Sequence, residues 1–94
     1  MTNKVDFRYN DMDFIAYLLT VGYEYTSIEV ALDNRTNKLK GFMHFEGDKN
    51  ELLDLYNQYK NEELLANVVQ MKNNRKKANM LIKSEIIKYQ ANKF

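Results

Sequence analysis

The chain has 94 residues, of which 45% are hydrophobic, with no cysteine, no proline and a formal net charge of +1. A chain of this length forms one domain, and its apolar content excludes a wholly disordered protein. The absence of cysteine excludes disulfide frameworks, thiol catalysis and zinc–thiolate sites, and it suits a reducing compartment. No apolar run approaches the roughly 20 residues that span a bilayer, and no signal-peptide pattern opens the chain. We therefore expect a cytoplasmic protein with no membrane contact.

The net charge combines two parts of opposite sign. Residues 1–70 contain twelve acidic and seven basic residues, whereas residues 71–94 contain seven basic residues and one acid, Glu85. We expect residues 1–70 to form an acidic α+β core, and residues 71–94 to form a basic helix packed on the same single domain. Such a division indicates contact with nucleic acid or an acidic partner, or a dipolar surface that has no partner.

The first predicted elements are a strand and an apolar helix. Residues 5–9 alternate between apolar and polar side chains, which is the period of a half-buried strand. Residues 11–21 then predict a helix, with Asn10 as its N-cap and Gly22 just after its end. Because this helix is apolar on nearly all sides, we expect it to be the central helix of the core.

Two further strands are predicted to form an antiparallel hairpin. Residues 28–33 and 39–45 alternate in the same way, and the loop between them is rich in residues that adopt turns. In this pattern Ala31 and Phe42 fall on the more polar face of the sheet. Either a second layer covers these two side chains, or they are exposed to a partner.

Two helices complete the chain. Asp48 and Glu51 form a start that resembles a capping box, and the apolar residues of the next two turns lie within an arc of about 100°: Leu52, Leu55, Tyr56 and Tyr59. A third helical region begins near residue 64 and either continues to about residue 89 or breaks at residues 73–74. The order β-α-β-β-α-α predicts an α+β domain with a small, largely antiparallel three-stranded sheet, one face of which packs on the first two helices.

Residues suited to catalysis are few. The single histidine, His44, has no nearby nucleophile such as the serine of a G-x-S-x-G turn, and we expect a histidine on the sheet surface or partly buried that is satisfied by a neighbouring residue. The pairs of acids near the helix starts, Asp11 with Asp13 and Glu51 with Asp54, could contribute to a divalent-ion site, but capping of the first turn explains most of them. We expect a protein that is not an enzyme and that has no cofactor and no metal.

The C-terminal helix carries an ordered basic face. On a helical wheel, one stripe about 100° wide collects five polar side chains: Lys72, Arg75, Lys76, Asn79 and Lys83. A neighbouring apolar side is expected to face the core: Met71, Ala78, Ile82 and Tyr89. If the helix is continuous, the stripe can bind the phosphates of nucleic acid or an acidic protein surface. The other interpretation is a solvated face, or one that pairs with the acidic part of its own chain.

Aromatic residues provide a second set of candidates. The seven tyrosines exceed what so small a core needs, and tyrosine is enriched at protein interfaces. We expect most of them at the edges of the core, and we take Tyr23, Tyr25 and Phe42 as candidates for an exposed patch that contacts a protein. The open edge of the sheet and the last helix permit a symmetric homodimer but do not require one.

Several of these segments together resemble a known group of proteins. The segments are residues 7–11, residues 16–19 with Gly22, residues 42–46 with Asp48, and residues 59–63. They are similar to a family of small uncharacterised phage and prophage proteins, a domain of unknown function from Gram-positive bacteria. Three departures are the spacing Phe-x-x-Phe-Glu in place of Phe-x-Phe-Glu, the absence of a proline before the last helix, and the basic C-terminal extension.

The resemblance implies a context rather than a mechanism. A small phage or prophage protein without catalytic motifs is expected to act in the host cytoplasm by binding a host protein or ribonucleoprotein, for example as an inhibitor of a host defence system. The alternative is a nucleic-acid-binding accessory protein that uses the basic C-terminal helix. An enzyme that acts through His44 and nearby acids is a third hypothesis.

Overall fold

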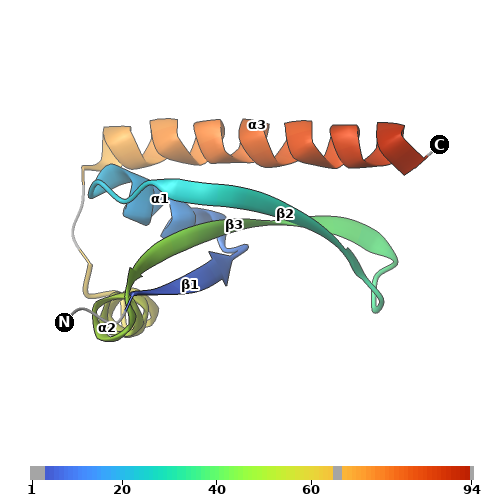
Figure 1. Cartoon of the computed structure of the whole chain (residues 1–94). Helices are drawn as coiled ribbons and strands as arrows, with labels where there is room; N and C mark the ends of the chain where they lie inside the picture. The colour runs from blue at the N-terminus through green and yellow to red at the C-terminus, as the bar shows by residue number, and fades with distance from the viewer. Residues whose placement is uncertain (1–3, 65–66, 94) are drawn as a thin grey trace.

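The fold, a computed structural model that describes residues 4–64 and 67–93, is a three-stranded antiparallel sheet with three helices (Figure 1). The elements follow in the predicted order: β1 Lys4–Tyr9, α1 Met12–Thr20, β2 Tyr25–Asp33, β3 Lys38–Asp48, α2 Lys49–Lys60 and α3 Val68–Lys93. Strand β3 is central, because β1 and β2 both pair with it in antiparallel register. The prediction of an α+β domain is confirmed. Among the described residues, no helix is both long enough and apolar enough to cross a membrane.

The helices cover one face of the sheet. Met43 of β3 lies opposite Tyr9 of β1 and Ile28 of β2, so these three side chains share a face. On the same face, Gly41 lies under Ile82 of α3. Figure 1 shows α3 running along β2 and β3, with α2 at the other side of the molecule beyond β1. Within the described ranges, no helix lies on the opposite face, which we call the open sheet face.

The core is built around α1. The ring of Phe14 is fully buried, and its centroid lies 4.9 Å from that of Tyr9, 5.1 Å from that of Tyr56 and 5.1 Å from that of Tyr59. Five consecutive residues of the helix are buried: Phe14, Ile15, Ala16, Tyr17 and Leu18. The prediction that this apolar segment forms the central core helix is therefore confirmed.

The N-cap of α1 is Asp11, so the prediction of Asn10 is wrong. The Asp11 carboxylate accepts hydrogen bonds from the backbone N–H groups of Asp13 at 3.1 Å and Phe14 at 3.4 Å. The Tyr59 hydroxyl donates to both oxygens of the same carboxylate, at 3.0 and 2.9 Å. A charged acceptor makes stronger hydrogen bonds than an amide, and a tyrosine from α2 holds this one in place.

Helix α3 is continuous from Val68 to Lys93 and does not break at residues 73–74. The Asn74 side chain donates to Thr20 Oγ1 of α1 at 3.0 Å, so this asparagine joins two helices instead of ending one. The helix starts at Val68 and not near residue 64, and the Asn67 side chain accepts the backbone N–H of Gln70 at 2.9 Å in its first turn. This side-chain acceptor satisfies an otherwise unpaired N–H and defines the start.

The apolar side predicted for the last helix does face the core. Ala78 is 0% exposed and Ile82 is 6% exposed, and both belong to the central cluster of buried side chains. Met71 and Tyr89 are half-buried on the same side. The orientation of α3 therefore leaves the opposite side of this helix in solvent.

Candidate functional site

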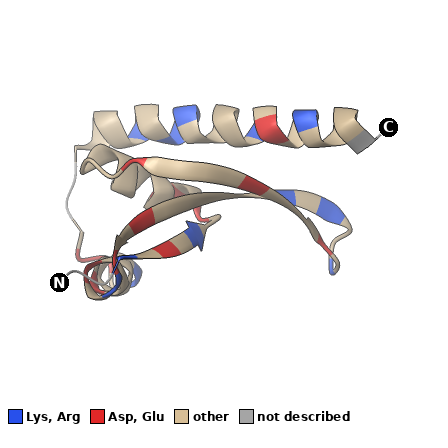
Figure 2. Cartoon of the chain, in the orientation of Figure 1, with Lys and Arg blue, Asp and Glu red and all other residues tan. Residues whose placement is uncertain are grey.

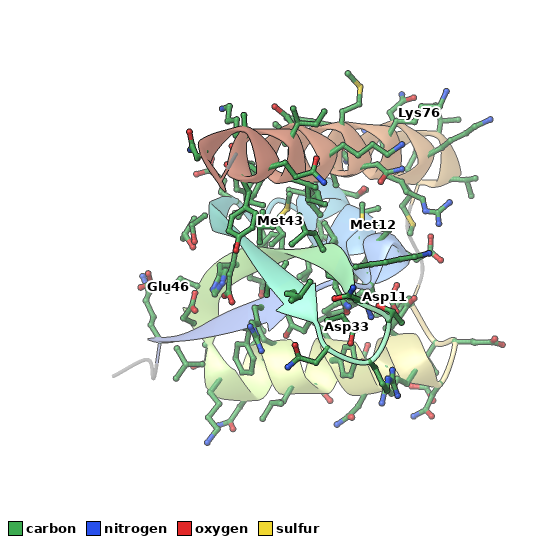
Figure 3. The ribbon with its side chains drawn as sticks, turned by 90° about the vertical axis from the view of Figure 1, so that its right-hand side faces the viewer. Asp11, Met12, Asp33, Met43, Glu46 and Lys76 are labelled. Carbon is green, nitrogen blue, oxygen red and sulfur yellow. The ribbon has the colours of Figure 1, made fainter. Side chains whose placement is uncertain are left out.

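The solvent side of α3, which we call the outer face of α3, contains four of the five residues of the predicted basic stripe. Lys72, Lys76, Asn79 and Lys83 are all exposed, and Lys76 points away from the sheet (Figure 3). Figure 2 shows basic residues repeating along this helix, in which Glu85 is the one acid. None of the three lysines forms an ion pair with another described residue.

Arg75 has a different role from the other members of the stripe. Its Nε lies 3.0 Å from Asp13 Oδ1 at the start of α1, and both side chains are about half exposed. The guanidinium therefore stands at the contact between α3 and α1. An exposed pair of this kind contributes little to stability, but it removes part of the charge available to a partner.

The outer face of α3 also presents apolar side chains, which the sequence analysis missed. Val69 is 68% exposed, Met80 is 72% exposed and Ile87 is 64% exposed. On a helical wheel these three residues lie within about 20° of one another, beside the lysines. The signal in the sequence is their spacing of eleven and seven residues, which repeats on one side of a helix. Helix α3 is thus apolar on two opposite sides.

The three predicted interface aromatics do not form one patch. Tyr25 lies opposite Phe45, whose side chain is buried beneath the helices, whereas Phe42 lies on the open sheet face. Tyr23 and Tyr25 line a hollow of about 480 Å³ at the end of α1, together with two residues of α3: Asn74 and Lys77. Phe42 is separated from both tyrosines by the thickness of the sheet.

Tyr23 is held in place by α2. Its ring packs against the buried cluster, and its hydroxyl donates a hydrogen bond to a carboxylate oxygen of Glu51. Burial, together with this hydrogen bond and the charge of Glu51, raises the pKa of the Tyr23 hydroxyl well above its usual range. The side chain is therefore a fixed edge of the core and a hydrogen-bond donor.

A charged network crosses the open sheet face and is centred on His44 of β3. Its Nδ1 lies 2.6 Å from Asp6 Oδ2 of β1, and its Nε2 lies 2.8 Å from Glu29 Oε1 of β2. Burial of the ring disfavours the charged imidazolium, but the hydrogen bonds and charges of the two carboxylates outweigh this, so the pKa of His44 is raised. Both ring nitrogens of the imidazolium donate, which leaves no lone pair to act as a general base.

Raising the pH is expected to weaken this network. The folded-state pKa of His44 lies above its ordinary value of 6.5, so the stabilisation is complete below that pH and is lost as the pH rises through the raised pKa. We expect the difference in free energy of unfolding between the wild type and His44→Gln to shrink as the pH rises above 6.5 and through the raised pKa of His44. Urea unfolding of both proteins at several pH values measures this difference in free energy. A difference that grows with pH would contradict the ion-paired histidine.

Phe42 is partly covered by an arginine and not by a second layer. The guanidinium carbon of Arg8 lies 4.5 Å from the centroid of the Phe42 ring, within the range of a cation–π contact. Arg8 Nη1 also lies 2.8 Å from Glu29 Oε2, so the same glutamate holds both Arg8 and His44. These contacts connect residues of all three strands on the open sheet face.

A scan against protein-family models and searches of curated proteins and of solved structures give no match to this chain. Among the residues that the structure describes, no group of three or more histidine, cysteine and acidic side chains is arranged to hold a metal ion. Two surfaces therefore stand as candidate binding sites, the outer face of α3 and the open sheet face.

Proposed function

We propose that this protein is a non-enzymatic accessory protein of phage or prophage type that binds a host protein, alone or within a ribonucleoprotein, through the outer face of α3. The observation that carries the proposal is the composition of that face. It combines three strongly exposed apolar side chains, Val69, Met80 and Ile87, with three exposed lysines that have no ion pair among the described residues: Lys72, Lys76 and Lys83.

A protein partner uses both kinds of side chain. Interfaces between proteins bury an apolar centre and surround it with a polar rim, and complementary charges across the rim set specificity and association rate. The partner surface would thus be apolar at its centre and acidic around it. A phosphate backbone would engage the lysines but leave Met80 and Ile87 without a counterpart.

Nucleic-acid binding through the same face is the second candidate. The three lysines are exposed and available, and each phosphate contact releases counterions. Contact by all three predicts that the logarithm of the affinity falls with the logarithm of the salt concentration with a slope of about −3. Reversing Lys76 and Lys83 to glutamate would then weaken binding to all sequences alike.

Co-purification from lysate of a Gram-positive host, with and without nuclease, distinguishes these two candidates. We expect a protein partner to remain after nuclease treatment. In titrations of the purified partner, Met80→Gln with Ile87→Gln should weaken binding by tenfold or more, because central apolar contacts contribute most to protein interfaces. Leu53→Gln is the matched control, since Leu53 is an exposed apolar residue of a different helix, 42% exposed on α2.

Three results would contradict binding of a protein through this face. The first is a partner that is lost completely on nuclease treatment. The second is an equal loss of affinity in the Leu53→Gln control and in the α3 variant. The third is the absence of any saturable protein partner from plausible host lysates.

A further inference from the structure

The open sheet face contains a hollow of about 560 Å³, which the proposed binding through the outer face of α3 does not use. It lies where β1, the ends of β2 and β3, and the loop between those two strands meet, and its lining includes Arg8, Ala31, Asn34, Arg35, Lys40 and Phe42. This volume falls within the range of about 300–1,000 Å³ that is typical of small-ligand sites. The outer face of α3 lies on the other side of the sheet, so the two surfaces can be tested independently.

The side chains that line the hollow near Phe42 are held in place by contacts within the protein. Arg8 lies over the Phe42 ring at 4.5 Å, and its guanidinium is held by Glu29 at 2.8 Å. Glu29 is in turn held by His44 at 2.8 Å. A guanidinium and an aromatic ring that are already fixed lose little conformational entropy on binding a planar group.

The remaining charges of the hollow favour an anion. Three cationic side chains line it, Arg8, Arg35 and Lys40, and two of them are paired with carboxylates, Arg8 with Glu29 and Lys40 with Asp33. Lys40 Nζ lies 2.8 Å from Asp33 Oδ2, and the backbone N–H of Arg35 donates to Asp33 Oδ1 at 2.9 Å. Asp33 and Lys40 therefore neutralise each other, whereas the Arg35 guanidinium forms no ion pair with any residue that the structure describes and leaves the hollow with an excess positive charge.

We propose that this hollow binds a nucleotide unit, with the base against the Arg8–Phe42 pair and the phosphate toward the unpaired guanidinium of Arg35. Bases stack on aromatic rings and on guanidinium planes, and arginine binds phosphate through paired hydrogen bonds. The side-chain amide of Asn34, at the edge of the hollow, can hydrogen-bond to a base. The nucleotide unit is either free or part of a single strand of nucleic acid.

The test is an NMR titration of the full-length ¹⁵N-labelled protein at constant ionic strength. The probes are adenosine 5′-monophosphate, adenosine, inorganic phosphate and a single-stranded adenine hexanucleotide. We expect the monophosphate to shift the amide signals of Arg8, Ala31 and Phe42 but not those of Lys76 and Lys83, and to bind more tightly than adenosine or phosphate. A hexanucleotide that binds at least tenfold more tightly than the monophosphate indicates a strand, and equal affinity indicates a free nucleotide.

Two variants test the assignment of the side chains. Phe42→Leu removes the aromatic ring under Arg8, and Arg35→Gln removes the proposed phosphate contact at an exposed side chain. Each is expected to weaken binding about tenfold. Lys49→Gln is the matched control, because it makes the same change in net charge at an exposed position at the start of α2.

Any of three results would overturn the proposal. One is the absence of saturable shifts at these amides up to about 10 mM monophosphate. Another is an affinity for inorganic phosphate equal to that for the monophosphate, since the base would then contribute nothing to binding. The last is an equal loss of affinity in Lys49→Gln and Arg35→Gln, which would show that the ligand is attracted by the overall charge of the protein and not by a defined site.

Discussion

Replacing Phe14 with alanine is expected to lower the free energy of unfolding by about 3–5 kcal/mol. The ring is fully buried on α1, and three tyrosine rings surround it at centroid distances of 4.9–5.1 Å: Tyr9, Tyr56 and Tyr59. Removing it leaves a cavity at the point where α1, α2 and β1 meet. Domains of this size have a total stability of about 5–15 kcal/mol, so the variant should be close to unfolding at room temperature.

Urea unfolding followed by circular dichroism measures this loss. The control is Phe14→Leu, which keeps most of the apolar volume and should be clearly less destabilising than the alanine variant. A loss of less than about 1 kcal/mol in Phe14→Ala would show that neighbouring side chains close the cavity and that the ring does not organise the core.

Replacing Gly41 with alanine is expected to cost about 1–3 kcal/mol by overpacking. A Cβ atom added at Gly41 would overlap the Cγ2 methyl of Ile82, which leans onto β3 from α3. Isoleucine in a helix has essentially one χ1 rotamer, so the side chain cannot turn aside and the helix must move. The same change should displace the outer face of α3 relative to the rest of the domain.

A double-mutant cycle isolates this contact. Ile82→Ala alone is expected to cost about 2–4 kcal/mol, but in the Gly41→Ala background the new methyl group no longer meets the Ile82 side chain. The double variant should therefore lose at least about 1 kcal/mol less than the sum of the two single losses. Gly22→Ala is the control: its added Cβ meets nothing within 4 Å, and its cost arises from a φ of +104°, so it should be additive with Ile82→Ala. Additive losses at Gly41 and Ile82 would contradict close packing of α3 on β3.

The helices and strands that could be predicted are those in which apolar and polar side chains repeat regularly over a few neighbouring residues. Alternation defined β1 and the β2–β3 hairpin, and a run of apolar residues identified α1 as the core helix. The strand order β1-β3-β2 does not follow from these patterns, because the alternation of side chains is the same in an edge strand and in a central strand. The N-cap at Asp11 was missed for a related reason, since Tyr59 lies 48 residues away in the chain.

Some features of the candidate sites could likewise be predicted from the sequence, and others could not. The exposed lysines of α3 were found because a helix places residues three and four apart on one side. The separation of Phe42 from Tyr25 was missed, because an irregularity in the register between Tyr25 and Ser27 shifts the alternation along β2. A histidine on the sheet that is satisfied by a neighbour was expected at His44, but its partners were not identified, because Asp6 and Glu29 belong to two different strands and meet His44 diagonally across the sheet.

The composition of the chain and the spacing of its apolar residues were thus enough to identify a small α+β domain with an acidic body and a basic C-terminal helix. Charge and amphipathicity depend only on residues that are close together in the sequence. Tertiary structure decided where α3 packs on the sheet, because that depends on the fit of Ile82 over Gly41. It also decided that Arg8, Phe42 and Lys40 share a hollow, because strand pairing brings β1 beside β3 across more than 30 residues of chain. Contacts between segments so far apart depend on packing, and no local pattern specifies them.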